Sequence, residues 1–333
     1  MEELVREKVE RGQTFAPEVK INKYSKFEKK HFRFCYLMVL FPVVQFAIFW
    51  AYVNFSSLIM AFQDKSGNFT LDNFKTVWQA FKYQDMFGIS LKDALVHSIT
   101  LWCINLFMCW PISIITTYVL FRRIPGHYAF RLCYIIPGLM GPIIWTTLVR
   151  YMVGYDGLIV SLCTKWGIEL PKLVYRNGFL GAAETAFPTL CVLAFVFGIV
   201  GNNAVLTGAF ARIPDELYEA AELDGAGFWR TCFTIAIPCV SSTLQTLLTF
   251  TFCGIFTADY SVYLYSGGTG QPNMETIGFQ LFNLTYQIAQ NGVTGAYSYG
   301  YPSALGFSLT MITLPVVLTS RHLIQKYFPA VEV

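Results

Sequence analysis

The sequence has few charged residues for its length. Asp, Glu, Lys and Arg make up 14% of the 333 residues, whereas roughly 25% is usual in soluble domains. Hydrophobic residues make up 54% and aromatic residues 17%. We therefore expect an integral membrane protein, because so apolar a chain needs lipid as its solvent. The net charge is only +3 and the basic residues form no stripe, so no nucleic-acid partner is expected.

Motifs of metal, redox and nucleotide chemistry are missing as well. The nine cysteines are scattered without a CxxC pair, and the four histidines are dispersed, which favours packing roles over a disulfide or metal site. The sequence has no Walker A segment, no HExxH and no recognisable nucleophile–base pair. We expect neither an enzyme activity nor a bound cofactor.

Six stretches are long and apolar enough to cross a bilayer as helices, which predicts an all-α fold. They are residues 34–55, 95–121, 132–152, 186–210, 237–258 and 303–320. Residues 31–333 are expected to form this six-helix domain, and residues 1–30 a polar tail. A further short helix is expected at the outer surface over residues 276–288.

The distribution of Lys and Arg predicts the orientation of these spans. If the N-terminal tail lies inside the cell, sixteen of the 24 basic residues fall on inside segments and eight on outside segments. Inside segments of membrane proteins are the more basic ones. Both termini are therefore expected in the cytoplasm.

The inside segment 211–238 departs from that rule, because from Arg212 onward it contains five acidic residues and two arginines. Pro214 suits the first position of a helix, where its missing N–H has no partner to lose. Acidic residues in the first turn stabilise a helix, because they lie near the positive end of its dipole. The spacing i, i+4, i+7 predicts one acidic stripe, formed by Asp215, Glu219 and Glu222, opposite Leu217, Ala220 and Ala221.

A helix–glycine–helix element is predicted from the same segment. Asp224-Gly225 ends the first helix, since glycine accepts the left-handed backbone. A second amphipathic helix follows, with apolar anchors at Phe228, Phe233, Ile235 and Ile237, and Pro238 opens the fifth span. Two interpretations compete: docking of another protein, or a hairpin resting on lipid. The acidic residues favour docking, because anionic headgroups repel them.

This segment resembles the signature of binding-protein-dependent ABC importer permeases. The run Ile-Pro-Asp-Glu-Leu-Tyr-Glu-Ala-Ala-Glu-Leu-Asp-Gly-Ala-Gly, residues 213–227, is similar to the multiple-sugar branch, on the side of the first maltose permease subunit. Residues 69–74, Phe-Thr-Leu-Asp-Asn-Phe, resemble an outer loop of sugar permeases. After Asp259, Gly267-Gly268 resembles their Asp…Gly-Gly-Pro ending of the fifth span, but Thr269 replaces the proline.

The resemblance implies a type I permease domain that forms half of a translocation path, in the bacterial cell membrane. Its implied partners are a second permease subunit, two cytoplasmic ATPase subunits and an extracellular solute-binding lipoprotein. The implied coupling helix, which enters a cleft of the ATPase, contains Glu219, Ala220, Ala221, Asp224 and Gly225. Glu219 is expected to contact the ATPase, and Gly225 to permit the turn.

Candidates for the substrate path depend on polar and aromatic residues near the fifth span. A carboxylate beside aromatic rings suits a sugar, which selects Thr257, Asp259, Tyr260 and Tyr263; an interfacial aromatic belt is the alternative. Phe195 and Gly198 are added by position, because this zone lines the cavity in similar sugar permeases. A permease for a polyamine, peptide or amino acid is the alternative function. An ion-coupled transporter is less favoured, because we find no intramembrane acidic relay or inverted repeat.

Overall fold

The computed structural model describes residues 26–64, 66–83, 90–122, 126–201, 203–258, 262–266, 273–291 and 299–327. The chain divides after Ser57 into two compact units, and each is described by itself. Over the described residues the regular structure is helical, apart from one isolated bridge between Gln63 and Phe69. The prediction of an all-α protein is confirmed.

The first unit contains α2 (Lys26–Gln45), the π-helical segment η1 (Phe46–Tyr52) and the beginning of α3 (Val53–Ala61). This helical stretch is long and apolar enough to span a bilayer from Phe34, and its most apolar window contains no buried residue. A helix that is apolar on all sides is solvated by lipid rather than by water. The stretch therefore corresponds to the first expected span.

The second unit contains the remaining helices of the described chain. They are α4 (Asp72–Lys82), α5 (Leu91–Cys103), η2 (Ile104–Cys109), α6 (Trp110–Phe121), α7 (His127–Leu139), α8 (Pro142–Val153), α9 (Leu158–Lys165), α10 (Lys172–Gly181), α11 (Ala183–Gly201), α12 (Asn203–Phe210), α13 (Asp215–Leu223), α14 (Phe228–Thr231), η3 (Cys232–Ala236), α15 (Ile237–Cys239), α16 (Ser241–Cys253), α17 (Val262–Ser266), α18 (Ile277–Asn291) and α19 (Gly300–Tyr327). The expected surface helix over residues 276–288 is α18.

Apolar stretches of spanning length in this unit follow most of the expected boundaries. They run Leu91–Phe121, Pro142–Lys165, Ala183–Phe210 and Gly300–Tyr327, and a bent pair, Phe228–Cys239 with Ser241–Cys253, adds one if it counts as a single span. The described residues thus contain five such helices, or six with the bent pair. The bend measures 74° and lies at Val240, two residues beyond Pro238.

The third expected span, residues 132–152, is wrong in its boundaries. Helix α7 ends at Leu139 and α8 begins at Pro142, with Met140 and Gly141 in extended conformation between them. A proline disfavours helical backbone at the residue before it, which explains the break at Gly141. The apolar stretch long enough to span begins only at Pro142.

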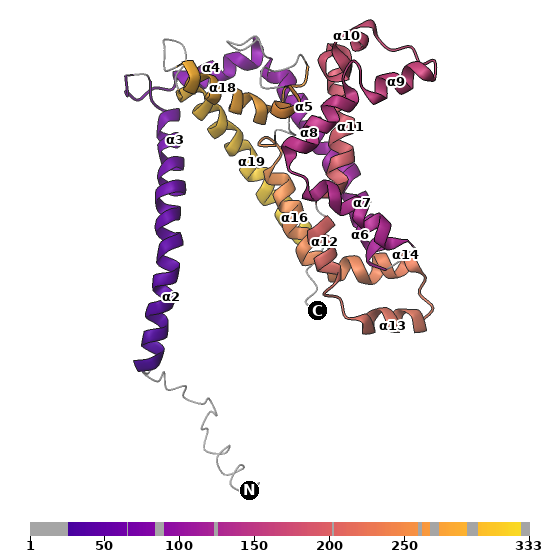
Figure 1. Ribbon diagram of the computed structural model, residues 1–333. Coiled ribbons are helices and arrows are strands. Elements are labelled where there is room, and N and C mark those ends of the chain that lie inside the picture. Colours follow the sequence, from indigo (N-terminus) through magenta and orange to yellow (C-terminus); the bar gives the residue numbers. More distant parts are fainter. Residues whose placement is uncertain are drawn as a thin grey trace. The chain divides into compact units, whose positions relative to one another are not determined.

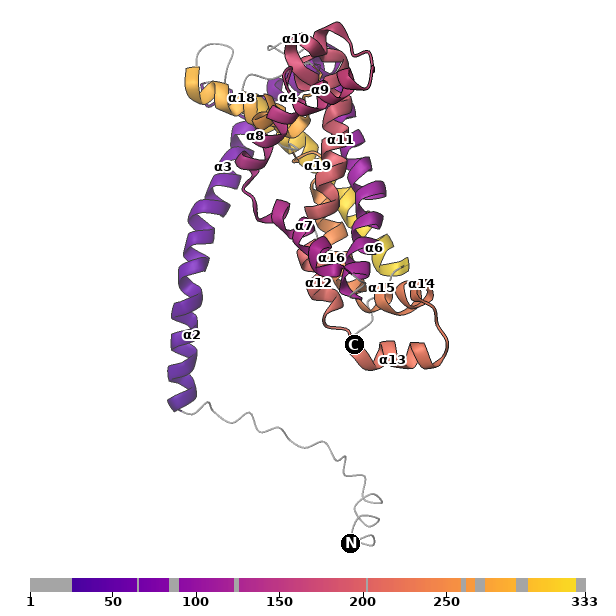
Figure 2. The same ribbon diagram turned by 45° about the vertical axis from the view of Figure 1, so that its right-hand side comes forward.

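Helices α13 and α14 lie at one end of the second unit, and α9 and α10 lie at the other (Figures 1 and 2). A hydrophobic cluster beside α13 joins side chains of α6, α12, α13, η3 and α16. A polar contact supports α6 against α12: the amide oxygen of Asn203 accepts hydrogen bonds from Thr117 (2.8 Å) and Ser113 (3.1 Å). The α13 end is therefore packed directly onto two spanning segments.

Candidate functional site

The first helix of the acidic segment is α13, and its ends have the predicted chemistry apart from the position of Pro214. It begins at Asp215, so Pro214 is the residue before the helix rather than its first residue. Asp215 and Glu216 lie in the first turn. At the other end, Gly225 has φ +71°, and its N–H donates to the carbonyl of Glu222 (3.1 Å). The N–H of Ala226 donates to Ala221 (2.9 Å), which completes a Schellman motif.

The faces of α13 differ from those predicted. Its buried residues are Tyr218 and Ala221, which are 2% and 5% exposed. Leu217 and Ala220 are exposed, so the expected apolar face of Leu217, Ala220 and Ala221 is wrong. The three residues of the predicted acidic stripe, Asp215, Glu219 and Glu222, all lie on α13 and are exposed.

The outward face of α13 lies opposite Tyr218 and Ala221. At 100° per residue, it contains Glu216, Glu219, Ala220 and Leu223, all of them exposed. Leu223 is 89% exposed, an unusual position for a leucine at the end of an otherwise acidic helix. The outward face thus combines carboxylates, one small residue and one apolar side chain.

Tyr218 anchors α13 to the rest of the unit, although it was not among the residues predicted to be important. Its ring lies 6.2 Å from that of Phe121 between centroids, in the cluster that also contains Tyr118 and Phe210. Burial raises the pKa of the Tyr218 hydroxyl, so it stays protonated. The available signal was its spacing of three residues from Ala221, which places both on one side of a helix.

An arginine at the end of α6 holds α13 from a second direction. Nη2 of Arg122 lies 2.5 Å from Oε1 of Glu222, and the guanidinium carbon lies 4.8 Å from the centroid of the Tyr218 ring. In the sequence, Arg122 stands out only as one of the basic residues of the expected inside segments. One side chain therefore contacts two residues of α13.

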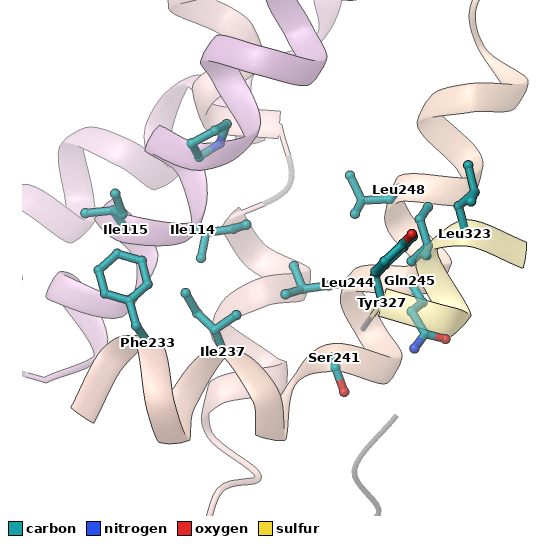
Figure 3. Close-up of a pocket in the computed structure, with 12 residues that line it drawn as sticks. Ile114, Ile115, Phe233, Ile237, Ser241, Leu244, Gln245, Leu248, Leu323 and Tyr327 are labelled. Carbon is teal, nitrogen blue, oxygen red and sulfur yellow. The ribbon is translucent and has the colours of Figure 1, made fainter. Parts of the chain in front are cut away.

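The second half of the segment is less regular than expected. It forms α14, η3 and α15 in succession, and its buried residues are Thr231, Cys232 and Ala236 rather than the predicted anchors. Phe233 is 56% exposed. Phe233 and Ile237 instead line an apolar cavity of about 520 Å³ with side chains of α6, α16 and α19 (Figure 3).

The described substrate-path candidates, Phe195, Gly198, Thr257 and Tyr263, do not line the cavity of Figure 3. Asp259 and Tyr260 lie outside the described residues. Gly198 faces η2, where a Cβ atom would lie 2.6 Å from Sγ of Cys109, and the carbonyl of Phe195 accepts a hydrogen bond from the same thiol (3.5 Å).

The two remaining candidates, Thr257 and Tyr263, contact α18. The carbonyl oxygen of Thr257 lies 2.8 Å from where a Cβ of Gly278 would be, so residues 257–258 pack on the start of α18. The ring of Tyr263 meets that of Phe282 edge to face, with centroids 4.9 Å apart. Their roles in a substrate path stay predictions.

A cavity of about 490 Å³ lies along the second half of α8 and the turn that leads to α9. Helix α9 lies at the end of the unit opposite α13 (Figure 1). It is lined by Thr147, Arg150, Tyr151, Gly154, Tyr155, Asp156 and Gly157. Hydrogen-bonding charged groups beside two phenol rings suit a carbohydrate. No motif in the sequence pointed to it; its charged and aromatic side chains, Arg150, Tyr151, Tyr155 and Asp156, come from the end of α8 and the turn that follows it.

Solved structures show the class to which this fold belongs. The chain resembles a bacterial alginate ABC transporter in complex with an alginate pentasaccharide-bound periplasmic protein, with TM-score 0.72 over 91% of this chain and 98% of the other, at 22% identity. A second structure of a bacterial ABC transporter that imports alginate gives TM-score 0.69 over 91% and 99%. The fold is that of an ABC importer permease.

Relatives in sequence are permease subunits as well. The chain is 27% identical over 298 residues to the diacetylchitobiose uptake system permease protein NgcF of Streptomyces coelicolor, covering 84% of this chain and 76% of the relative. It is 26% identical over 307 residues to the polygalacturonan/rhamnogalacturonan transport system permease protein YteP of Bacillus subtilis, covering 89% and 88%. No protein-family model matches the chain. The chain is a homologue of sugar ABC transporter permeases and a multi-pass membrane protein.

Proposed function

We propose that this chain is a membrane permease subunit of an ATP-driven importer and forms half of the translocation path for a sugar or oligosaccharide. An extracellular binding protein delivers the sugar, a second permease subunit completes the path, and two cytoplasmic ATPase subunits supply the energy. The named uptake systems of the relatives, for diacetylchitobiose and for polygalacturonan and rhamnogalacturonan, support a carbohydrate. Both termini lie in the cytoplasm in this proposal, and residues 1–30 form a tail before the permease domain.

The observation that carries the proposal is the division of α13 into two faces. Tyr218 and Ala221 are buried in the chain's own core, while Glu219, Ala220 and Leu223 are exposed. A short helix held firmly on one side and uncovered on the other is suited to transmit force from a partner. Glu219 and Ala220 contact the ATPase, Ala221 packs against the permease, and Asp224 and Gly225 form the turn.

The substrate path is the less constrained part of the proposal. Phe195, Gly198, Thr257, Asp259, Tyr260 and Tyr263 remain its candidates. The cavity at Arg150 and Asp156 adds a place, beside the turn that leads to α9, where an incoming sugar meets aromatic and charged groups. A permease for another solute is the alternative within this class.

Reversing the charge at Glu219 tests the docking role. We expect Glu219→Lys to abolish ATP-dependent uptake and co-purification of the ATPase, with the variant still in the membrane. Glu169→Lys makes the same charge change at an exposed acid in the segment between α9 and α10, helices that lie at the other end of the unit (Figure 1), and is expected to leave both unchanged. Normal ATPase binding and uptake by Glu219→Lys would contradict the proposal.

The substrate class needs a separate measurement. The binding protein that delivers the substrate in this proposal is purified and titrated with labelled disaccharides, oligosaccharides, polyamines, peptides and amino acids, and uptake is then measured with the ligand that binds. A carbohydrate ligand agrees with the proposal. A binding protein that binds only a peptide, polyamine or amino acid would contradict the proposed sugar substrate and support the alternative, a permease for that solute.

A further inference from the structure

Helix α13 is connected to two spanning segments in different ways. Residues 211–214 join it covalently to α12, which ends at Phe210. Its direct connection to α6 is made by side chains: Tyr218 packs against Phe121, and Glu222 pairs with Arg122, the residue that follows α6. Movement of α13 can therefore reach α12 through the backbone, whereas it reaches α6 through these side-chain contacts and through the packing of α12 on α6.

Arg122 is well placed to carry such a contact. It caps the C-terminal end of α6, where its N–H donates to the carbonyl of Tyr118 (3.0 Å), so its backbone moves with the helix. Its side chain is 28% exposed, compared with 62% for Glu222, so the arginine is the sheltered partner of the pair. Sheltering from water and salt strengthens an ion pair relative to a fully exposed one.

The Tyr218 ring gives the guanidinium a second contact on the same helix. Arg122 lies over this ring at 4.8 Å, and the ring is itself buried against Phe121 of α6. A planar guanidinium can pair with a carboxylate and lie over an aromatic face at once, which the point charge of lysine does less well. Three residues, Arg122, Tyr218 and Glu222, thus form a clamp between α6 and α13.

We propose that Arg122 is a positioning residue that couples the docking helix to the second spanning segment, so that ATPase movement drives α6 together with α12. This inference depends on the proposed function, because it assumes that α13 receives the force. The clamp lies away from the outward face of Glu219, Ala220 and Leu223. Its loss therefore leaves ATPase docking in place and separates ATP hydrolysis from transport.

The test uses the complete transporter in proteoliposomes with sugar-loaded binding protein. ATPase co-purification, ATP hydrolysis and sugar uptake are measured for Arg122→Gln and Glu222→Gln. We expect normal co-purification and a ratio of sugar imported to ATP hydrolysed that falls by about fivefold. The matched control is Arg212→Gln, an exposed arginine just before α13 with no ion pair to another described residue, and it is expected to keep the wild-type ratio.

A charge exchange separates coupling from simple damage. The double variant Arg122→Glu with Glu222→Arg restores the ion pair in reverse, and we expect it to recover part of the lost transport ratio. If Arg122→Gln does not reach the membrane, Glu222→Gln carries the test, because Glu222 is exposed and tolerates an isosteric amide. A wild-type ratio in Glu222→Gln, or no recovery in the exchange, overturns the inference.

The outcome also separates this inference from the proposed function. If Glu219→Lys stops uptake while Arg122→Gln and Glu222→Gln transport normally, the docking role stands and only the clamp is wrong. If Glu219→Lys transports normally, the docking role itself fails.

Discussion

Gly198 of α11 and Cys109 at the end of η2 are in close contact, with no room for a side chain between them. A Cβ atom added to Gly198 would lie 2.6 Å from Sγ of Cys109 and 3.1 Å from Nδ2 of Asn105. The Cys109 thiol donates to the carbonyl of Phe195 at 3.5 Å, so it also bonds to the backbone of α11. Small residues permit this close approach of helices in membranes.

Gly198→Ala is expected to destabilise the protein by about 1–3 kcal/mol, because the added methyl group forces α11 away from η2. The matched control is Gly201→Ala on the same helix, where a Cβ would meet nothing within 4 Å. Thermal unfolding in detergent should show a lower midpoint for Gly198→Ala only. Equal midpoints would contradict the packing role, and Cys109→Ala in the Gly198→Ala background should recover part of the loss.

Gly225→Ala tests the turn after α13. Gly225 has φ +71°, where an L-residue is strained, although its Cβ would meet nothing within 4 Å. We expect the free energy of unfolding to fall by about 1 kcal/mol and ATPase co-purification to weaken. Gly225→Asn should be less affected, because asparagine tolerates this conformation. Gly227→Ala is the control, since Gly227 has φ −70° and equal space. A Gly227→Ala defect as large as that of Gly225→Ala would show that side-chain size, not backbone strain, matters.

Composition and length were sufficient to predict the helical membrane fold and most spans. The reason is physical: a bilayer requires about 20 apolar residues per helix, and this requirement is local in sequence. The break at Gly141 before Pro142 was readable in principle from the proline, but the surrounding residues are apolar enough to conceal it.

The contacts of α13 could be predicted only in part, because its two faces depend on where α6 lies. Its glycine turn and the acidic residues of its first turn follow from local chemistry, and these predictions were right, whereas Pro214 was placed one residue too far into the helix. In a helix of nine residues, Leu217 with Ala220 and Tyr218 with Ala221 are both plausible inward pairs, and α6 selects the second. The pairing of Arg122 with Glu222 joins distant segments and leaves no local pattern.

Leu223→Asp tests the outward face of α13. Leu223 is 89% exposed in the isolated chain, so the change is expected to leave its thermal unfolding midpoint unaltered. If a partner buries this side chain, its loss removes about 1.5–3 kcal/mol of binding free energy, which weakens ATPase affinity by roughly tenfold or more. Titration of the ATPase into permease nanodiscs measures the affinity. Leu223→Met is the control and should bind as the wild type; unchanged binding by Leu223→Asp would remove Leu223 from the docking face.

Glu275→Gln tests a half-buried carboxyl group just before α18. Burial raises the pKa of Glu275, and the nearby carboxylate of Asp93 raises it further. Its backbone carbonyl lies 3.1 Å from Nδ1 of His97; because a carbonyl only accepts, that nitrogen carries the proton.

With a folded-state pKa above the unfolded-state value, the folded protein holds this proton to a higher pH than the unfolded chain does. Stability is therefore lost as the pH rises from the unfolded-state pKa through the folded-state pKa. Above both pKa values, the loss of stability is complete. Glu275→Gln removes the charge, so we expect a higher unfolding midpoint than wild type at pH 7.5 and a smaller difference at pH 4.5. Asp93→Asn should raise the midpoint in the same direction by removing the neighbouring charge. A Glu275→Gln variant that is less stable than wild type at pH 7.5 would show that the ionised carboxylate has a stabilising partner.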